Sequence, residues 1–167
     1  VNNYIEIKHD GELMLGTGSN MAGKSTYLRS IGVNVILAMA GAPVCAKELK
    51  ISHVQVISSM RITDNLAEST STFYAELKKL KTIIEKVNAG EKVFILLDEI
   101  LRGTNSFDRH IGSVALVRQL IKHHAAAIIA THDLELAKIK DEYPENVINY
   151  HFDVQVSNDE LYFDYKL

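Results

Sequence analysis

The chain has 167 residues, 47% of them hydrophobic and 23% charged, a composition typical of one globular domain with a substantial core. Its formal net charge of −3 argues against a DNA-binding surface on the domain itself, because neutralising phosphates requires clustered Lys and Arg. The single cysteine, Cys45, excludes an internal disulfide and fits a reducing compartment.

The sequence predicts neither a signal peptide nor a membrane partner. Residues 1–10 carry charged side chains and lack an apolar core. The most apolar stretch, residues 31–46, is interrupted by Asn34, by glycines and by Pro43, which is not the pattern of a membrane span.

Apolar patterning divides the chain into alternating strands and helices. The predicted strands cover residues 4–8, 13–17, 54–58, 93–99 and 125–132, and the predicted helices cover residues 24–40, 71–90 and 108–122. Two alternating segments joined by "SNDE", residues 149–156 and 160–167, predict a C-terminal β-hairpin. This order predicts an α/β fold with a mainly parallel sheet flanked by helices on both faces, in which ligands bind at the carboxyl ends of the strands.

Two of these helices are expected to bury one face each. In the helix of residues 71–90, that face holds Phe73, Leu77, Leu80, Ile84 and Val87. In the helix of residues 108–122, it holds Ile111, Val114, Leu120 and Ile121.

The segment before the first helix predicts a phosphate-binding loop. Gly18, Gly23, Lys24 and Ser25 fit the pattern G-x-x-x-x-G-K-[ST]. Glycine permits backbone N–H groups to wrap phosphate oxygens, the lysine brings a charge to the terminal phosphates, and the serine hydroxyl can bind Mg²⁺. The alternative is a glycine turn that caps an ordinary helix. The preceding strand and the following helix N-terminus, which attracts anions, favour the phosphate loop.

Two acids end the strand of residues 93–99. A phosphate-loop enzyme needs a carboxylate near Mg²⁺, usually through a bound water, and Asp98 is placed for that role. Hydrolysis also needs a group that orients and helps to deprotonate water, for which Glu99 is the candidate. The alternative is a strand that ends in solvent-facing acids, but the presence of a phosphate loop favours the catalytic interpretation.

His132 comes at the end of the next strand, where it could contact the γ-phosphate or the attacking water. The alternative is a capping or surface histidine. The other histidines, including His123 and His124, are predicted to be solvated, and none has the spacing of a zinc site.

Serine and threonine cluster at the start of the helix of residues 71–90. Such residues cap helices well, and a hydroxyl-rich helix N-terminus is also an anion site. The cluster lies one helix upstream of Asp98 rather than beside the phosphate loop, which suggests that it serves a nucleotide held by another subunit.

Four segments, "TGSNMAGKSTYLR", "STFYAEL", "LLDEILRGTNSFD" and "ATHD", occur in the order and spacing of the ATPase domain of MutS-type DNA mismatch repair proteins. The chain resembles this family, whose fold is a P-loop NTPase of ABC-ATPase type, over nearly its whole length. The resemblance implies Mg²⁺-dependent ATP hydrolysis, with ATP and ADP as ligands. It also implies a dimer, of this chain or with a related subunit, with two composite ATP sites. Each site takes its phosphate loop from one subunit and its signature serine from the other.

The resemblance also assigns individual residues. Ser71 matches the signature serine that acts in trans, Asn20 matches the asparagine of the phosphate loop, and residues 104–108 match the loop along the dimer interface. Tyr165 falls where the family places a ring against adenine, and a strand tyrosine that packs on its neighbours is the alternative. The expected nucleotide-binding residues of the loop are Gly18, Ser19, Asn20, Met21, Ala22, Gly23, Lys24, Ser25 and Thr26; Ser25 and Asp98 are the expected metal residues, and Glu99 and His132 the catalytic ones.

Several positions depart from the family pattern. Ser19 stands in place of a proline, Ala22 and Leu101 stand in place of glycines, and Asn105 stands in place of a serine. None of these removes a group that touches phosphate or metal, and together they suggest a divergent bacterial MutS-like branch. Gly16, inside an otherwise apolar strand, predicts a bulge or a local weak point.

The family organisation implies that residues 1–167 are an excised C-terminal ATPase domain acting in the bacterial cytoplasm. DNA-binding and clamp domains would precede it, and a helical segment that supports the dimer would follow it. One alternative is a nucleotide-binding switch that hydrolyses little in isolation, and another is the ATPase of a different ABC-type DNA-processing protein. A transporter ATPase is disfavoured because the chain has no LSGGQ-like signature.

Overall fold

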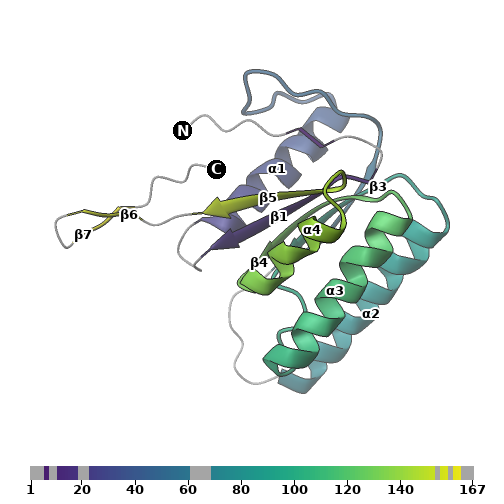
Figure 1. Cartoon of the computed structure of the whole chain (residues 1–167). Helices are drawn as coiled ribbons and strands as arrows, with labels where there is room; N and C mark the ends of the chain where they lie inside the picture. Colours follow the sequence, from purple (N-terminus) through teal and green to yellow (C-terminus); the bar gives the residue numbers. More distant parts are fainter. Residues whose placement is uncertain are drawn as a thin grey trace.

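The computed structural model describes residues 6–7, 11–18, 23–60, 69–152, 155–157 and 160–162, with the backbone alone for 69–72, 155–157 and 160–162. A five-stranded sheet runs through its centre (Figure 1). Its strands are β1 (Leu13–Gly18), β2 (Gln55–Ser59), β3 (Val93–Asp98), β4 (Ala126–Thr131) and β5 (Val147–Phe152). They lie in the order β2-β3-β4-β1-β5, and every pairing between neighbours is parallel, as the sequence predicted.

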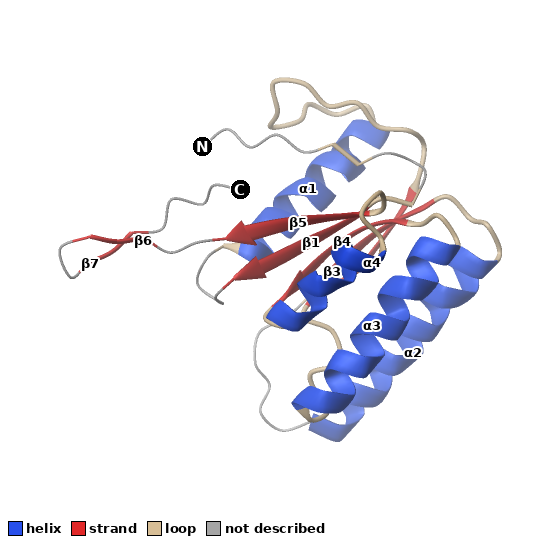
Figure 2. Ribbon diagram, viewed as in Figure 1, coloured by secondary structure: helices blue, strands red, loops and turns tan. Residues whose placement is uncertain are grey.

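Helices cover both faces of this sheet. They are α1 (Lys24–Met39), α2 (Ser69–Asn88), α3 (Ser106–Lys122) and α4 (Ile139–Glu142), with a 3₁₀-helix, η2 (Leu134–Lys138), before α4. One face carries α1, and the opposite face carries α2, α3 and α4 (Figure 2). None of the helices in the described ranges is long and apolar enough to cross a membrane.

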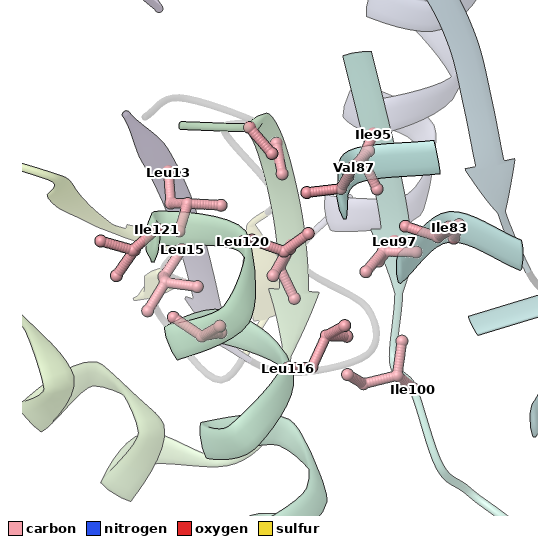
Figure 3. Packing of buried hydrophobic residues seen from close by; sticks show 14 of the residues in the cluster. Leu13, Leu15, Ile83, Val87, Ile95, Leu97, Ile100, Leu116, Leu120 and Ile121 are labelled. Atoms are coloured by element: carbon pink, nitrogen blue, oxygen red, sulfur yellow. The ribbon is translucent and has the colours of Figure 1, made fainter. Parts of the chain in front are cut away.

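Alternation along each strand decides which core a side chain joins. In β3, Ile95 and Leu97 join the core beneath α2 and α3, whereas Phe94 and Leu96 join the core beneath α1. Figure 3 shows the first of these cores, where Ile83 and Leu120 reach the sheet from their helices. Because both faces are covered, the central strands appear in the sequence as continuous apolar runs.

The predicted apolar faces of two helices are partly wrong. Leu77 of α2 is 41% exposed and Ile111 of α3 is 50% exposed. In α2 the residues buried against the sheet are Leu80, Ile83 and Val87. Helical spacing predicts an apolar stripe, but the contact with the sheet selects which side of that stripe is buried.

The first strand of the predicted C-terminal hairpin is also wrong. Residues 149–152 belong to β5, which pairs in parallel with β1. The antiparallel pairing of β6 (Gln155–Ser157) with β7 (Glu160–Tyr162) covers only three residues of each strand, and residues 163–167 lie outside the described part. Alternation has the same period in a sheet strand and in a hairpin, so the sequence pattern could not distinguish them. Of the strand predicted at residues 4–8, only residues 6 and 7 are described, and they lie outside any strand.

Gly16 does not mark a bulge, contrary to the sequence-based expectation. The register of β1 runs through it without interruption, opposite Ala130 on one side and Tyr150 on the other. A Cβ atom at Gly16 would lie 3.1 Å from Cε2 of Phe152, so the glycine makes room for that ring. Phe152 packs edge-on against Tyr27 of α1, with the ring centroids 5.5 Å apart.

Candidate nucleotide-binding site

Three separate sequence motifs meet at the carboxyl edge of the sheet. The backbone carbonyl of Gly18, at the end of β1, accepts a hydrogen bond from Lys24 Nζ at 2.5 Å. The same carbonyl lies 2.8 Å from Nδ1 of His132, which follows β4. His132 Nε2 is paired with the carboxylate of Glu99, which follows β3. The parallel order of the strands therefore brings the lysine, the acid and the histidine of the sequence motifs together.

Lys24 is the first residue of α1 and is only 2% exposed. Gly23 caps this helix in the left-handed conformation, with φ 88°, which glycine adopts without a steric penalty. Burial lowers the pKa of Lys24 from 10.5, while the negative charges of Glu99 and Asp98 act in the opposite direction. The ammonium group is thus held at the helix N-terminus, where an anion is favoured.

Asp98 is the last residue of β3 and is 5% exposed. Its Oδ2 atom is buried and receives no hydrogen bond from any group in the described part of the chain. A buried acceptor without a partner is costly, and a cation would satisfy it. Ser25, half-buried in the first turn of α1, supplies a hydroxyl oxygen in the same motif as Lys24. This all-oxygen donor set fits Mg²⁺, which prefers oxygen ligands.

Glu99 is fixed by its backbone and by both carboxylate oxygens. Its φ is 51°, in the left-handed region that non-glycine residues seldom adopt. Its N–H donates to the carbonyl of Ala130 at 2.8 Å, and its Oε2 lies 3.0 Å from a guanidinium nitrogen of Arg102. With His132 on Oε1, the side chain is held between two basic groups and is 17% exposed.

His132 connects the phosphate-loop strand with Glu99. Its Nδ1 faces the Gly18 carbonyl and its Nε2 faces the Glu99 carboxylate. Nδ1 also lies 3.5 Å from Lys24 Nζ. This histidine therefore stands beside the place where a terminal phosphate would meet the lysine.

The family comparison matches residues 14–167 to MutS domain V. This chain belongs to the MutS domain V family. Domain V is a P-loop ATPase domain, which confirms the family and the general fold predicted from the four motifs. A DNA mismatch repair protein MutS from Chlorobium phaeovibrioides is 37% identical in an alignment over 158 residues, and the match covers 92% of this chain and 18% of that protein. The chain thus spans about a fifth of the length of this relative.

Arg102 is a site residue of this MutS domain V that the sequence analysis missed. Besides its ion pair with Glu99, its Nε donates to the Glu99 carbonyl at 2.9 Å and its NH2 to the Asp98 carbonyl at 3.2 Å. It therefore braces the backbone of both strand-end acids and the side chain of Glu99. An arginine three residues after an acid was the available signal, because it allows a local ion pair.

Among the histidines predicted to be solvated, His110 has a side chain that is 38% exposed and that also makes a specific contact. Its Nδ1 lies 2.6 Å from Oδ2 of Asp133, the residue that follows His132. Oδ1 of Asp133 accepts from the N–H groups of Glu135 and Leu136 and caps η2. His110 and η2 together fix the backbone beside His132. His110 lies 23 residues before Asp133, so no local pattern could have revealed the contact.

The remaining predicted site residues are placed only in part. The structure describes the backbone of Ser71 in the first turn of α2, and Thr26 is exposed in the first turn of α1. Asn105, which replaces the serine of the family pattern, caps α3 by accepting from Asp108 N at 2.9 Å. The phosphate-loop residues 19–22, including Ser19, Asn20, Met21 and Ala22, and Tyr165 near the C-terminus lie outside the described residues.

Proposed function

We propose that this MutS domain V binds ATP and ADP with Mg²⁺ at the carboxyl edge of its sheet and hydrolyses ATP. The proposal places it as the ATPase of a MutS-like DNA mismatch repair protein. One observation carries it: buried Lys24, partly buried Glu99 and solvent-accessible His132 form a connected group beside the Gly18 carbonyl, at the start of the phosphate-loop pattern.

When a nucleotide binds, the ammonium group of Lys24 would exchange one hydrogen-bond acceptor for another. Lys24 now donates to a backbone carbonyl, and terminal phosphate oxygens would take that place. Ser25 and the unpartnered Oδ2 of Asp98 would hold the Mg²⁺, with Asp98 acting through a bound water. When bound, the ion supplies positive charge to the phosphate oxygens. Gly18 to Thr26 would enclose the phosphates with their backbone N–H groups.

Hydrolysis needs a base that faces the γ-phosphate, and Glu99 is proposed for that role. Its carboxylate would accept a proton from water while the water oxygen bonds to the γ-phosphorus. The bond from that phosphorus to the bridging oxygen breaks, and ADP and inorganic phosphate are the products. His132, paired with Glu99 and close to Lys24, would orient the water and the γ-phosphate.

The second part of the proposal is a site shared between two subunits. Ser71 would contact the nucleotide of the partner, residues 104–108 would lie along the interface, and Tyr165 would pack on adenine. Support comes from two exposed aromatic residues in these segments: Tyr74 of α2 is 73% exposed and Phe107 of α3 is 71% exposed. Aromatic residues are enriched in protein interfaces.

The partners of the whole protein belong to the same proposal. They are a second copy or a related subunit, and DNA gripped by parts other than this acidic domain. Nucleotide-dependent dimer changes would then drive a clamp on DNA in the bacterial cytoplasm. The net charge of −3 supports this division of labour.

The experiment is the variant Glu99→Gln, measured for ATP affinity, steady-state phosphate release and mass in solution. Loss of a general base costs about 10²–10⁴ in rate, so hydrolysis should fall by that factor while ATP binding is kept. The mass should rise with ATP and not with ADP. Glu91→Gln changes an exposed acid that is paired with Lys86 and is the matched control.

The outcomes separate the two parts of the proposal. Full hydrolysis by Glu99→Gln removes Glu99 from catalysis. Slow hydrolysis without an ATP-dependent rise in mass rejects the composite site and keeps the chemistry. If the parent protein releases phosphate no faster than the Lys24→Ala variant, a nucleotide-binding switch with little hydrolysis is favoured.

A further inference from the structure

The turn that follows β3 is held in an unusual backbone conformation. Glu99 and Leu101 have φ angles of 51° and 58°, both in the left-handed region. Leu101 stands where the family pattern has glycine, the residue that adopts this region without a penalty. Such conformations persist where the surrounding structure fixes them from several sides, and they cluster at functional sites.

Helix α2 supplies the contact that fixes the middle of this turn. The N–H of Leu101 donates to Oε1 of Glu76 at 2.6 Å. The same helix presses on the end of the turn, because a Cβ atom at Gly103 would lie 2.6 Å from Cβ of Phe73. The turn is therefore shaped against α2 by one hydrogen bond and one close packing contact.

The turn after β3 is packed into the core, so it has little room to relax if Glu76 moves. Ile100, between the two left-handed residues, is 4% exposed, and Leu101 is 7% exposed. The side chain of Leu101 fills the space beside Gly112 of α3, where a Cβ atom would overlap its Cδ1. Close-packed interiors transmit a shift instead of dissipating it. A movement of Glu76 would thus reorient the backbone of Glu99, two residues before Leu101.

Helix α2 carries both the residue proposed to contact the nucleotide of the partner and the residue that holds the turn after β3. Ser71 lies in the first turn of α2, and Glu76 lies five residues later. We infer that Glu76 is a positioning residue, through which contact of Ser71 with the nucleotide of the partner sets the orientation of Glu99 in its own site. This inference rests on the composite site of the proposed function. It makes hydrolysis in one subunit depend on occupancy of the other.

The test uses the complete natural chain and three variants of α2. Glu76→Met removes the acceptor and keeps a long side chain, Glu76→Gln keeps an acceptor oxygen, and Glu85→Met removes an acid of the same helix whose Oε1 lies 3.8 Å from Lys81 Nζ. The free energy of a hydrogen bond to a charged group corresponds to roughly a tenfold change or more in a rate or equilibrium constant. Glu76→Met should therefore lower kcat about tenfold with an ATP Kd within about twofold. Glu76→Gln and Glu85→Met should stay near the parent.

A double-mutant cycle with Ser71→Ala separates a relay from a merely structural contact. If Glu76 carries the signal, Ser71→Ala should slow the parent and change Glu76→Met by no more than about twofold, because coupled residues are not additive. If the two effects on kcat multiply, the residues act independently and the inference is wrong. The inference is also overturned if Glu76→Met changes the ATP Kd by more than about twofold, or if Glu76→Gln has a kcat as low as that of Glu76→Met.

Failure of the proposed function gives a different result. If Ser71→Ala alone leaves hydrolysis unchanged, the composite site is wrong and the relay falls with it. If Ser71→Ala slows hydrolysis but the effects multiply, the composite site stands and only the relay is rejected. If Glu76→Met melts below the assay temperature, Glu76→Asp replaces it in the same cycle, because its carboxylate is one methylene too short to reach Leu101 N.

Discussion

The two edges of the sheet are built from the same parallel strands, yet they present opposite chemistry. At the carboxyl edge, Lys24 is 2% exposed and Asp98 is 5% exposed, and Lys24 lies beside Glu99 and His132. At the amino edge, a cavity of about 580 Å³ is lined largely by apolar side chains such as Ile31, Val54 and Phe94. The charged side chains that line it belong to exposed residues, among them Lys50, Glu91 and Lys92.

Helix direction explains why the buried charges of the described residues, Lys24 and Asp98, lie at the carboxyl edge. The N-terminus of α1 points to the carboxyl edge, where its free N–H groups and dipole favour an anion. The C-termini of α1, α2 and α3 lie at the other end of the sheet, and their carbonyl groups disfavour phosphate (Figure 2). The amino edge therefore has space, but the ends of α1, α2 and α3 that face it disfavour an anion. In this domain, the amino-edge cavity and the groups arranged to bind an anion therefore lie at opposite edges of the sheet.

The largest effect is expected from breaking the buried charge at the carboxyl edge. Lys24→Ala should weaken ATP binding by at least about 30-fold, because removing one partner of a buried charge pair costs about 2–5 kcal/mol. Calorimetry on folded protein measures it. Lys92→Ala, at the exposed rim of the amino edge, should bind ATP like the parent. Equal ATP affinity in both variants would remove Lys24 from the site.

The next largest effect is expected at Asp98, the acid whose Oδ2 has no hydrogen-bond partner in the described part of the chain. Asp98→Asn keeps the size of the side chain and removes the charge, so it should raise the Mg²⁺ concentration needed for ATP binding. A carboxylate that acts through water on a metal is worth about 10–100-fold in metal affinity. Mg²⁺ titrations at fixed ATP measure the change, with Asp141→Asn, at an exposed position of α4, as the control. An unchanged Mg²⁺ requirement would contradict the assignment.

A third prediction compares a glycine from each edge. Gly112→Ala should destabilise the fold by about 1–3 kcal/mol through overpacking against Leu101. Gly90, which lines the amino-edge cavity, has φ 74° and open space around it, so Gly90→Ala should cost only its backbone strain, about 1–2 kcal/mol. Chemical denaturation measures both.

The Leu101→Gly background distinguishes the causes. There, Gly112→Ala should lose most of its cost, because the overlapping Cδ1 atom is gone. The cost of Gly90→Ala should be unchanged. Equal costs of Gly112→Ala in the two backgrounds would show that Leu101 is not the clashing group.

The smallest effect concerns adenine. Stacking of a ring on a base is worth on the order of 1 kcal/mol beyond area burial, so Tyr165→Ala should weaken ATP binding about fivefold. Tyr165→Phe should bind like the parent. If Tyr165→Ala is folded and keeps the parental affinity for ATP, the ring packs on its neighbours and not on the base.

The sequence alone determined the local elements and the chemistry of single motifs. Glycine spacing around Lys24 indicated the phosphate loop, and the apolar runs before Asp98 and His132 indicated buried parallel strands. These signals are local, since they depend on backbone preferences and on periodicity within one element. They were enough to place the candidate residues at one edge, because parallel strands end on the same side.

Only the tertiary structure decided how those residues contact one another. Glu99 meets His132, and Asp133 meets His110, although most or all of α3 and all of β4 separate the partners in the sequence, so no local pattern reveals either pairing. Likewise, Gly16 is explained only by the ring of Phe152 on a neighbouring strand. Strand order and register bring distant segments within hydrogen-bonding distance. Neither is set by the periodicity of a single strand, because the same alternation fits several partners.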